Sequence, residues 1–285
     1  MKKQKIVFIG GLTNGKIVLD YLLSNIHVDV PLILTYPKNH KIPRYSELNA
    51  PNHKVTFKYH LDGDAILDEI SLIEPDFIFV AGWSNMLSAE LLAIPKSGTI
   101  GFHPSKLPND RGRSVLAWQI EDGYRETALS MFYYNNLPDC GDIIAQERIR
   151  IEYNDYIEDV LCKVDQATYN LMKAYFPLLR RATAPRRQQD INEGNFRRLR
   201  TDKDSMLNWD TNVEVIYNKI RAISRPYPGA IGAIGGVSYR IWRAIPCNAP
   251  SKLENANAGH HYIDNSQPIV KCRDGCIKIL DYETL

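Results

Sequence analysis

One histidine and one carboxylate stand in short polar loops that suit acid–base chemistry. His103 opens the segment HPSKLP at residues 103–108, and Asp139 stands in PDCGD at residues 138–142. A carboxylate that binds an imidazole orients the ring and stabilises its charged form, so the two side chains together could accept and return a proton. The pattern predicts a proton-transfer site, whereas a histidine of a proline-rich loop, taken alone, is more often structural.

The loops are positioned by strands that the sequence marks as buried. The apolar runs at residues 76–81 and 99–102 lack polar alternation, which is typical of strands buried on both faces of a sheet. Further strands are expected at residues 5–10, 28–36, 54–59, 127–134 and 143–151, and helices around 17–22 and at 62–73, 87–94, 114–123 and 155–181. This alternation predicts an α/β fold with a Rossmann-like, mainly parallel, doubly wound sheet.

The first loop leaves the predicted sheet at its carboxyl edge. His103 directly follows the strand at residues 99–102, and open parallel sheets bind ligands beyond the carboxyl ends of their strands. Pro104 and Pro108 restrict the backbone of the loop. Ser114 is a suitable N-cap for the helix that follows. We therefore expect His103 at the mouth of a ligand site.

The character of the chain changes after the long helix. Residues 180–203 lose apolar periodicity and carry eight basic against three acidic side chains. We interpret them as a solvated connector. The alternative is a basic strip that contacts a phosphate-bearing substrate. A helix at 213–223 and short strands from 229 follow. We predict a catalytic domain at residues 1–184, a linker at 185–204 and a small β-rich C-terminal domain at 205–285.

Several familiar binding motifs are excluded by single residues or spacings. The run GGLTNGK at residues 10–16 fits a phosphate-binding loop, but Ile17 stands where that motif needs a hydroxyl to hold magnesium. The dinucleotide fingerprint GxGxxG is absent from the same turn. Cys272 and Cys276 lie near two histidines at spacings that match no zinc site. We therefore expect no metal.

The composition narrows the class of partner and the compartment. Lys and Arg total 35 against 33 Asp and Glu, a balance that argues against nucleic acid as the main partner. The five cysteines form no CxxC pair and indicate reduced thiols. No apolar run approaches the ~20 residues of a membrane span, and the N-terminus lacks a signal-peptide pattern. We expect a cytoplasmic protein that does not bind membranes.

Together, the motifs resemble a known enzyme family. Residues 103–108 with Arg111 and Gly112 resemble the HPSxLPxxRG signature of the folate-dependent formyltransferases, and residues 139–143 (DCGDI) resemble that family's DxGxI element. The chain also resembles the family at its domain junction, through Trp209, residues 220–222 (IRA) and residues 226–230 (PYPGA). The resemblance implies a Rossmann-like formyltransferase domain, a small β-rich C-terminal domain, and 10-formyltetrahydrofolate as the co-substrate.

The resemblance also implies roles for individual residues. His103 would transfer a proton near the formyl group, and Asp139 would hold it and help to remove a proton from the attacking amine. The pterin ring of the folate would pack between two loops, with Arg113 nearby. The residues implied for this slot are Asn85, Met86 and Leu87 on one side and Asn135, Asn136, Leu137, Pro138 and Asp139 on the other.

One position departs from the family pattern. The family has Asn two residues before the histidine, and this chain has Gly101. The Asn amide binds the formyl oxygen as it gains negative charge, which Gly101 cannot do with a side chain. Protonated His103, an ordered water, or an amide of Asn135 or Asn136 could substitute. We expect a water in the vacated space, a slow but active enzyme, and equal or higher activity for Gly101→Asn.

The acceptor is inferred from the C-terminal part. Residues 205–285 are short and nearly neutral, with nine basic and seven acidic side chains, whereas a tRNA-binding member would need a longer and more basic tail. We therefore expect an N-formyltransferase for the amine of a nucleotide-linked amino sugar, with a place in lipopolysaccharide or other glycan biosynthesis. The alternatives are a methionyl-tRNA formyltransferase and a non-catalytic folate- or sugar-nucleotide-binding relative. The sequence leaves open whether the protein forms a homodimer.

Overall fold

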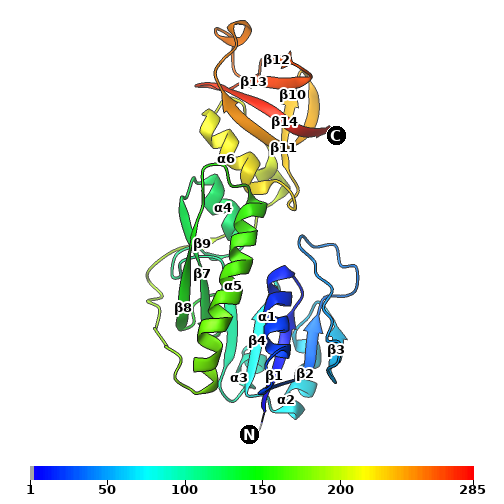
Figure 1. Cartoon of the computed structure of the whole chain (residues 1–285). Helices are drawn as coiled ribbons and strands as arrows, with labels where there is room; N and C mark the ends of the chain where they lie inside the picture. Colours follow the sequence, from blue (N-terminus) through cyan, green and yellow to red (C-terminus); the bar gives the residue numbers. More distant parts are fainter. Residues whose placement is uncertain (1–2) are drawn as a thin grey trace. The chain divides into compact units, whose positions relative to one another are not determined.

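The computed structural model describes residues 3–285 (Figure 1). Its contacts divide the chain into two compact units. The first comprises the described residues up to Gly112, Ala128–Ile149 and Cys162–Phe196, and the second comprises Arg113–Thr127, Arg150–Leu161 and Arg197–Leu285. Both units include part of the long helix α5 (Ile157–Arg180). The domain boundaries expected near residues 184 and 204 stay a prediction.

A seven-stranded sheet forms the centre of the first unit. Its strands lie in the order β3-β2-β1-β4-β5-β7-β8. The first five are parallel, and β7 runs antiparallel to β5. The strands are β1 (Gln4–Gly10), β2 (Val28–Thr35), β3 (Thr56–Tyr59), β4 (Phe77–Ala81), β5 (Thr99–His103), β7 (Glu126–Tyr133) and β8 (Ile143–Arg150). The predicted mainly parallel Rossmann-like sheet is confirmed.

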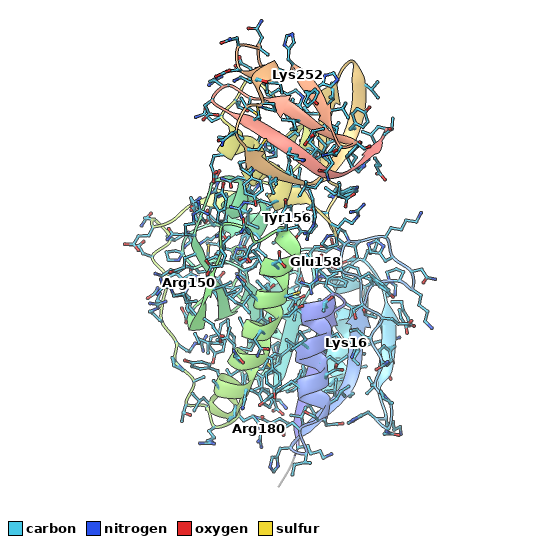
Figure 2. All side chains as sticks on the ribbon, turned by 45° about the horizontal axis from the view of Figure 1, so that its top comes forward. Lys16, Arg150, Tyr156, Glu158, Arg180 and Lys252 are labelled. Atoms are coloured by element: carbon cyan, nitrogen blue, oxygen red, sulfur yellow. The ribbon has the colours of Figure 1, made fainter. Side chains whose placement is uncertain are left out.

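Helices cover both faces of this sheet, which explains why its central strands are apolar on both sides. On one face, Phe176 of α5 packs edge-on against Phe79 of β4 and Tyr21 of α1 (Thr13–Leu23), with ring centroids 5.8 Å apart in both pairs. Figures 1 and 2 show α1 and α5 side by side, and Glu158 and Arg180 label the two ends of α5. On the other face, Ile78 and its neighbours pack against η1 (Asp64–Ile66), α2 (Leu67–Ile73) and α3 (Ala89–Ala93).

The second unit contains a small antiparallel sheet. Its five strands lie in the order β10-β11-β14-β13-β12, accompanied by two α-helices and two short 3₁₀ turns. The elements are α4 (Val115–Glu121), η2 (Asp202–Ser205), α6 (Val213–Ile223), β10 (Ala230–Ile234), β11 (Val237–Cys247), η3 (Ser251–Leu253), β12 (His261–Asp264), β13 (Gln267–Lys271) and β14 (Cys276–Thr284). Cys272 and Cys276 are fully buried, and burial raises the pKa of the Cys272 thiol to about 12. The predicted β-rich C-terminal part is confirmed.

Two local features differ from the sequence-based expectation. Part of the segment interpreted as a connector forms β9 (Phe196–Arg197), which pairs with β6 (Arg111–Gly112). Ser114 does occupy the N-cap position of α4, but its side chain makes no cap hydrogen bond. Its hydroxyl instead accepts the backbone N–H of Arg200 at 3.2 Å. Among the described residues, no helix combines the length and the apolar character that a membrane crossing requires.

The burial of α1 against the sheet predicts a large stability difference between two leucines. Leu19 of α1 is 0% exposed, whereas Leu72 of α2 is 85% exposed. We expect Leu19→Ala to lower the free energy of unfolding by about 2–5 kcal/mol, because it leaves a cavity in a packed core. Leu72→Ala, the matched control, should change it by no more than about 0.5 kcal/mol. Chemical denaturation measures both, and similar losses for the two variants would contradict the packing described.

Candidate active site

His103 is the last residue of β5, and its imidazole is held by a main-chain carbonyl. The side chain is buried, and Nε2 lies 2.8 Å from the carbonyl oxygen of Asp110. A carbonyl can only accept, so Nε2 carries a proton and donates it. Nδ1 is then the nitrogen that can gain or lose a proton. It lies 3.5 Å from Oδ1 of Asp139.

Asp139 is oriented by one backbone hydrogen bond and by the conformation of its loop. Its Oδ2 accepts the N–H of Gly112 at 2.9 Å, which leaves Oδ1 toward the imidazole. Its φ of 55° is left-handed, a conformation that Asp tolerates better than most side chains. At Gly141, two residues later, a Cβ would lie 1.7 Å from the carbonyl oxygen of Tyr133. Only glycine allows this close approach, so the loop can adopt this backbone conformation only with glycine at position 141.

A segment that the sequence indicated only as part of a connector holds both loops. We call residues 189–195 the clamp segment. Gln189 is buried and donates from Nε2 to the carbonyls of Asp139 and Gly141, at 2.9 and 2.7 Å. Asn195 accepts the N–H of Asp110 at 2.8 Å and donates to its carboxylate at 3.0 Å. The clamp segment therefore supports the residues that hold His103 and Asp139.

Arg111 fixes the clamp segment from within. Its side chain is 1% exposed, and the guanidinium donates to the carbonyls of Glu193 and Asp190 at 3.0 and 3.2 Å and to Oε1 of Gln189 at 3.2 Å. A planar guanidinium can make several such bonds in one orientation, which suits it to this task. The Arg of the recognised RG pair thus has a structural partner in a distant part of the sequence.

The residues expected to contact folate lie on two loops, one after β4 and one after β7. Asn85, Met86 and Leu87 follow β4, where Leu87 is buried, Met86 is 69% exposed, and Asn85 donates to the carbonyl of Leu61. The second loop follows β7, where Asn135 accepts the N–H of Leu137 at 2.9 Å. Its Asn135, Asn136, Leu137 and Pro138 are exposed, and Asp139 is half-buried.

One aromatic residue joins these two loops. Tyr134 packs against the core cluster that contains Leu87 and against a second cluster that contains Leu107. Arg113, also expected near folate, is exposed and belongs to the second compact unit, where its N–H bonds the carbonyl of Arg197 at 3.0 Å. The structure thus brings His103 and Asp139 together, whereas the contacts of Arg113 lie within the second unit.

The space beside Gly101 is occupied by a side chain, and the expectation of a water there is wrong. A Cβ at this position would lie 2.0 Å from Cε2 of Tyr134. The Tyr134 ring is stacked on Phe132, with ring centroids 5.1 Å apart. Glycine at position 101 leaves room for the ring, and a larger residue would have to displace it. An asparagine at position 101 would displace Tyr134, so the structure leads us to expect lower activity for Gly101→Asn.

Comparison with family models identifies the fold and the class of enzyme. A model described as "Formyl transferase" matches residues 4–175, and one described as "Formyl transferase, C-terminal domain" matches residues 200–284. The chain belongs to the formyl transferase family. The resemblance drawn from the HPSKLP and DCGDI motifs, and the classification as a formyl-transferring enzyme, are thereby confirmed.

Solved structures of similar fold come from several branches. An N-formyltransferase from Helicobacter canadensis, in complex with folinic acid and dTDP-3-aminofucose, has a TM-score of 0.73 at 17% identity, covering 99% of this chain and all of that one. HypX from Aquifex aeolicus with tetrahydrofolic acid has 0.71 at 17%, with 98% and 44% covered, so this chain spans less than half of HypX. Methionyl-tRNA formyltransferase from Clostridium thermocellum has 0.62 at 18%, with 99% of both covered.

The clamp segment leads to a prediction about Gln189. Replacing it by Leu removes the donor to the Asp139 and Gly141 carbonyls, and a displaced catalytic loop can cost up to about 100-fold in rate. We expect Gln189→Leu to lower kcat for formyl transfer strongly while the far-UV circular dichroism stays unchanged. Gln188→Leu is the matched control, because Gln188 is exposed. Equal activities for the two variants would contradict the clamp.

Proposed function

We propose that this protein transfers a formyl group from 10-formyltetrahydrofolate to the amine of a nucleotide-linked amino sugar, in the cytoplasm and as a step of glycan biosynthesis. The observation that carries the proposal is the His103–Asp139 contact of 3.5 Å at the carboxyl edge of the sheet. That edge is where folds of this kind bind ligands. All five cysteines are free thiols, which fits a reducing compartment.

Each of the two loops carries exposed apolar surface that a flat folate ring could cover. Met86 and Leu137 are apolar side chains that are 69% and 47% exposed, and each lies on one of the two loops. Apolar surface of this kind is what a pterin ring could cover. The indole N–H of Trp83, two residues before Asn85, is buried and has no hydrogen-bond partner among residues 3–285. A polar edge of the bound ring could accept it. These residues would hold the co-substrate.

The chemistry needs one proton to move across the site. Bound 10-formyltetrahydrofolate supplies the formyl carbon: the amine nitrogen bonds to it, its bond to the donor nitrogen breaks, and the amine proton passes to that nitrogen. His103 would carry the proton at Nδ1, since Nε2 stays bonded to the Asp110 carbonyl. Asp139 would stabilise the charged imidazole through Oδ1 and keep the ring oriented.

An amino sugar is favoured over tRNA by the charge of the second unit. Several basic residues near the end of the connector are already paired there. Arg198 donates to Asp204 at 2.7 and 2.5 Å and lowers the pKa of that carboxyl, and Arg200 lies 2.6 Å from Glu121. Paired guanidiniums bind phosphates less readily than free ones. The Helicobacter canadensis protein, whose structure contains dTDP-3-aminofucose, is matched along its full length.

The rival acceptor is methionyl-tRNA. The Clostridium thermocellum methionyl-tRNA formyltransferase also aligns along its whole length, so chain length does not separate the two functions. A non-catalytic binding relative is the second rival, suggested by Gly101 in place of the family's Asn. The oriented His103–Asp139 pair argues against it, since a binding protein has no need of a prepared proton carrier.

The catalytic pair is tested by His103→Ala and Asp139→Asn. We expect each to lower kcat by about 10²–10⁴-fold, the usual worth of a proton-transfer group. His60→Ala is the control, because His60 is exposed and outside the site. Turnover of formyl donor is measured by the release of tetrahydrofolate. Near-normal turnover in either variant, with unchanged circular dichroism, would remove that residue from the mechanism.

The acceptor is tested by offering two classes of amine. With 10-formyltetrahydrofolate present, we expect formylated product from a panel of nucleotide-linked amino sugars and none from methionyl-tRNA, as read by mass spectrometry. Neutralising Arg197, Arg198 and Arg200 together should change the sugar-nucleotide affinity little. A tight, strongly salt-dependent tRNA complex that this change abolishes would favour the rival acceptor. Donor binding without any product would favour the non-catalytic relative.

A further inference from the structure

Gly101, His103 and Tyr134 share one face of the large sheet. In the antiparallel pair of β5 and β7, Gly101 lies opposite Phe132 and His103 lies opposite Ser130. Directly opposed residues project to the same face, and the face repeats every second residue. The N–H of Tyr134 bonds the carbonyl of Thr99 at 2.8 Å, so the alternation continues through Tyr134. The Tyr134 ring therefore stands on the same side as the His103 imidazole.

The ring lies directly over the bare backbone of Gly101. A Cβ on Gly101 would be 2.0 Å from Cε2, 2.8 Å from Cδ2 and 3.0 Å from Cζ of Tyr134. These three atoms form one edge of the ring, centred on Cε2, which is bonded to the carbon that carries the hydroxyl. Stacking on Phe132 restrains the ring in this place. The phenol thus fills the volume in which a side chain at position 101 would otherwise lie.

The hydroxyl of Tyr134 is a neutral donor without a partner. Among residues 3–285, no hydrogen bond reaches this hydroxyl. The hydroxyl is not one of the buried polar atoms that lack a partner, so it is accessible to solvent. Burial raises the pKa of Tyr134 far above its usual range, and the nearby Asp139 carboxylate and Tyr36 raise it further. The hydroxyl therefore keeps its proton at neutral pH.

We propose that Tyr134 is a catalytic residue whose hydroxyl donates a hydrogen bond to the formyl oxygen as that oxygen gains negative charge. The inference rests on the proposed formyl transfer. When the amine nitrogen bonds to the formyl carbon, the carbonyl electron pair moves onto oxygen, and it returns when the bond to the donor nitrogen breaks. No atom leaves Tyr134. A preorganised donor at this oxygen stabilises the charge without a cost of reorganisation.

The alternative is that the Tyr134 ring serves packing alone. A phenylalanine would fill the same volume over Gly101 and stack on Phe132 equally well. The hydroxyl adds nothing to this packing: it has no protein partner among residues 3–285, and it reaches solvent, where a ligand can approach it. The hydroxyl is therefore expected to have its partner in the bound formyl group, and Tyr134→Phe separates the two roles.

The first test is the infrared spectrum of the bound donor, with no acceptor present. Donor carrying ¹³C in its formyl group is bound to the wild type and to Tyr134→Phe, and the isotope-shifted carbonyl stretch is compared. A hydrogen bond to the oxygen weakens the C=O bond and lowers this frequency. We expect the stretch to rise in Tyr134→Phe and to stay at the wild-type value in Tyr133→Phe. Tyr133 projects to the opposite face, with Arg186 3.9 Å from its ring.

The second readout is the kinetic constants with an accepted amine. We expect Tyr134→Phe to lower kcat by about 100-fold, as for loss of one oxyanion donor, with little change in KM for the donor. Gly101→Ala should lower kcat too, because its Cβ displaces the ring. An unchanged stretch and kcat in Tyr134→Phe would overturn this inference alone. Failure of the wild type to bind the labelled donor would overturn the proposed function, and the inference with it.

Discussion

The contact between His103 and Asp139 depends on how firmly the chain holds each partner. The imidazole is fixed by the Asp110 carbonyl and the carboxylate by the Gly112 N–H, so both are oriented by main chain. Because the two main-chain partners belong to one short loop, a shift of that loop would move both side chains together. The 3.5 Å separation is therefore set by the backbone path between β5 and α4.

The support for this loop comes from far along the sequence. The clamp segment binds the backbone of both loops through Gln189 and Asn195, and buried Arg111 binds the clamp segment in return. Each of these bonds is buried or partly buried, where a hydrogen bond is stronger and its loss costs more than on the surface. The clamp segment, which was expected only to connect two parts of the chain, therefore also supports the site.

The sheet and the contact between His103 and Asp139 could be predicted because both rest on local patterns. Apolar strands such as β4 are readable from composition, and the HPSKLP and DCGDI loops carry recognisable motifs. The clamp segment was missed because single polar residues such as Gln189 give no periodic signal. The role of Gly101 was misjudged for a related reason: an absent side chain suggests space, and only the fold shows that Tyr134 fills it. Long-range contacts of this kind are set by tertiary packing, which local propensity does not encode.

The account's central claim is that His103 and Asp139 form the centre at which the formyl group is transferred. The most direct test is a crystal structure of the protein with a stable 10-formyl folate analogue bound. We predict the formyl group within hydrogen-bond reach of Nδ1 of His103, at about 2.6–3.2 Å or through one water, with the ring between the Met86 and Leu137 loops. An ordered analogue whose formyl group lies beyond the reach of both His103 and Asp139 would contradict the account.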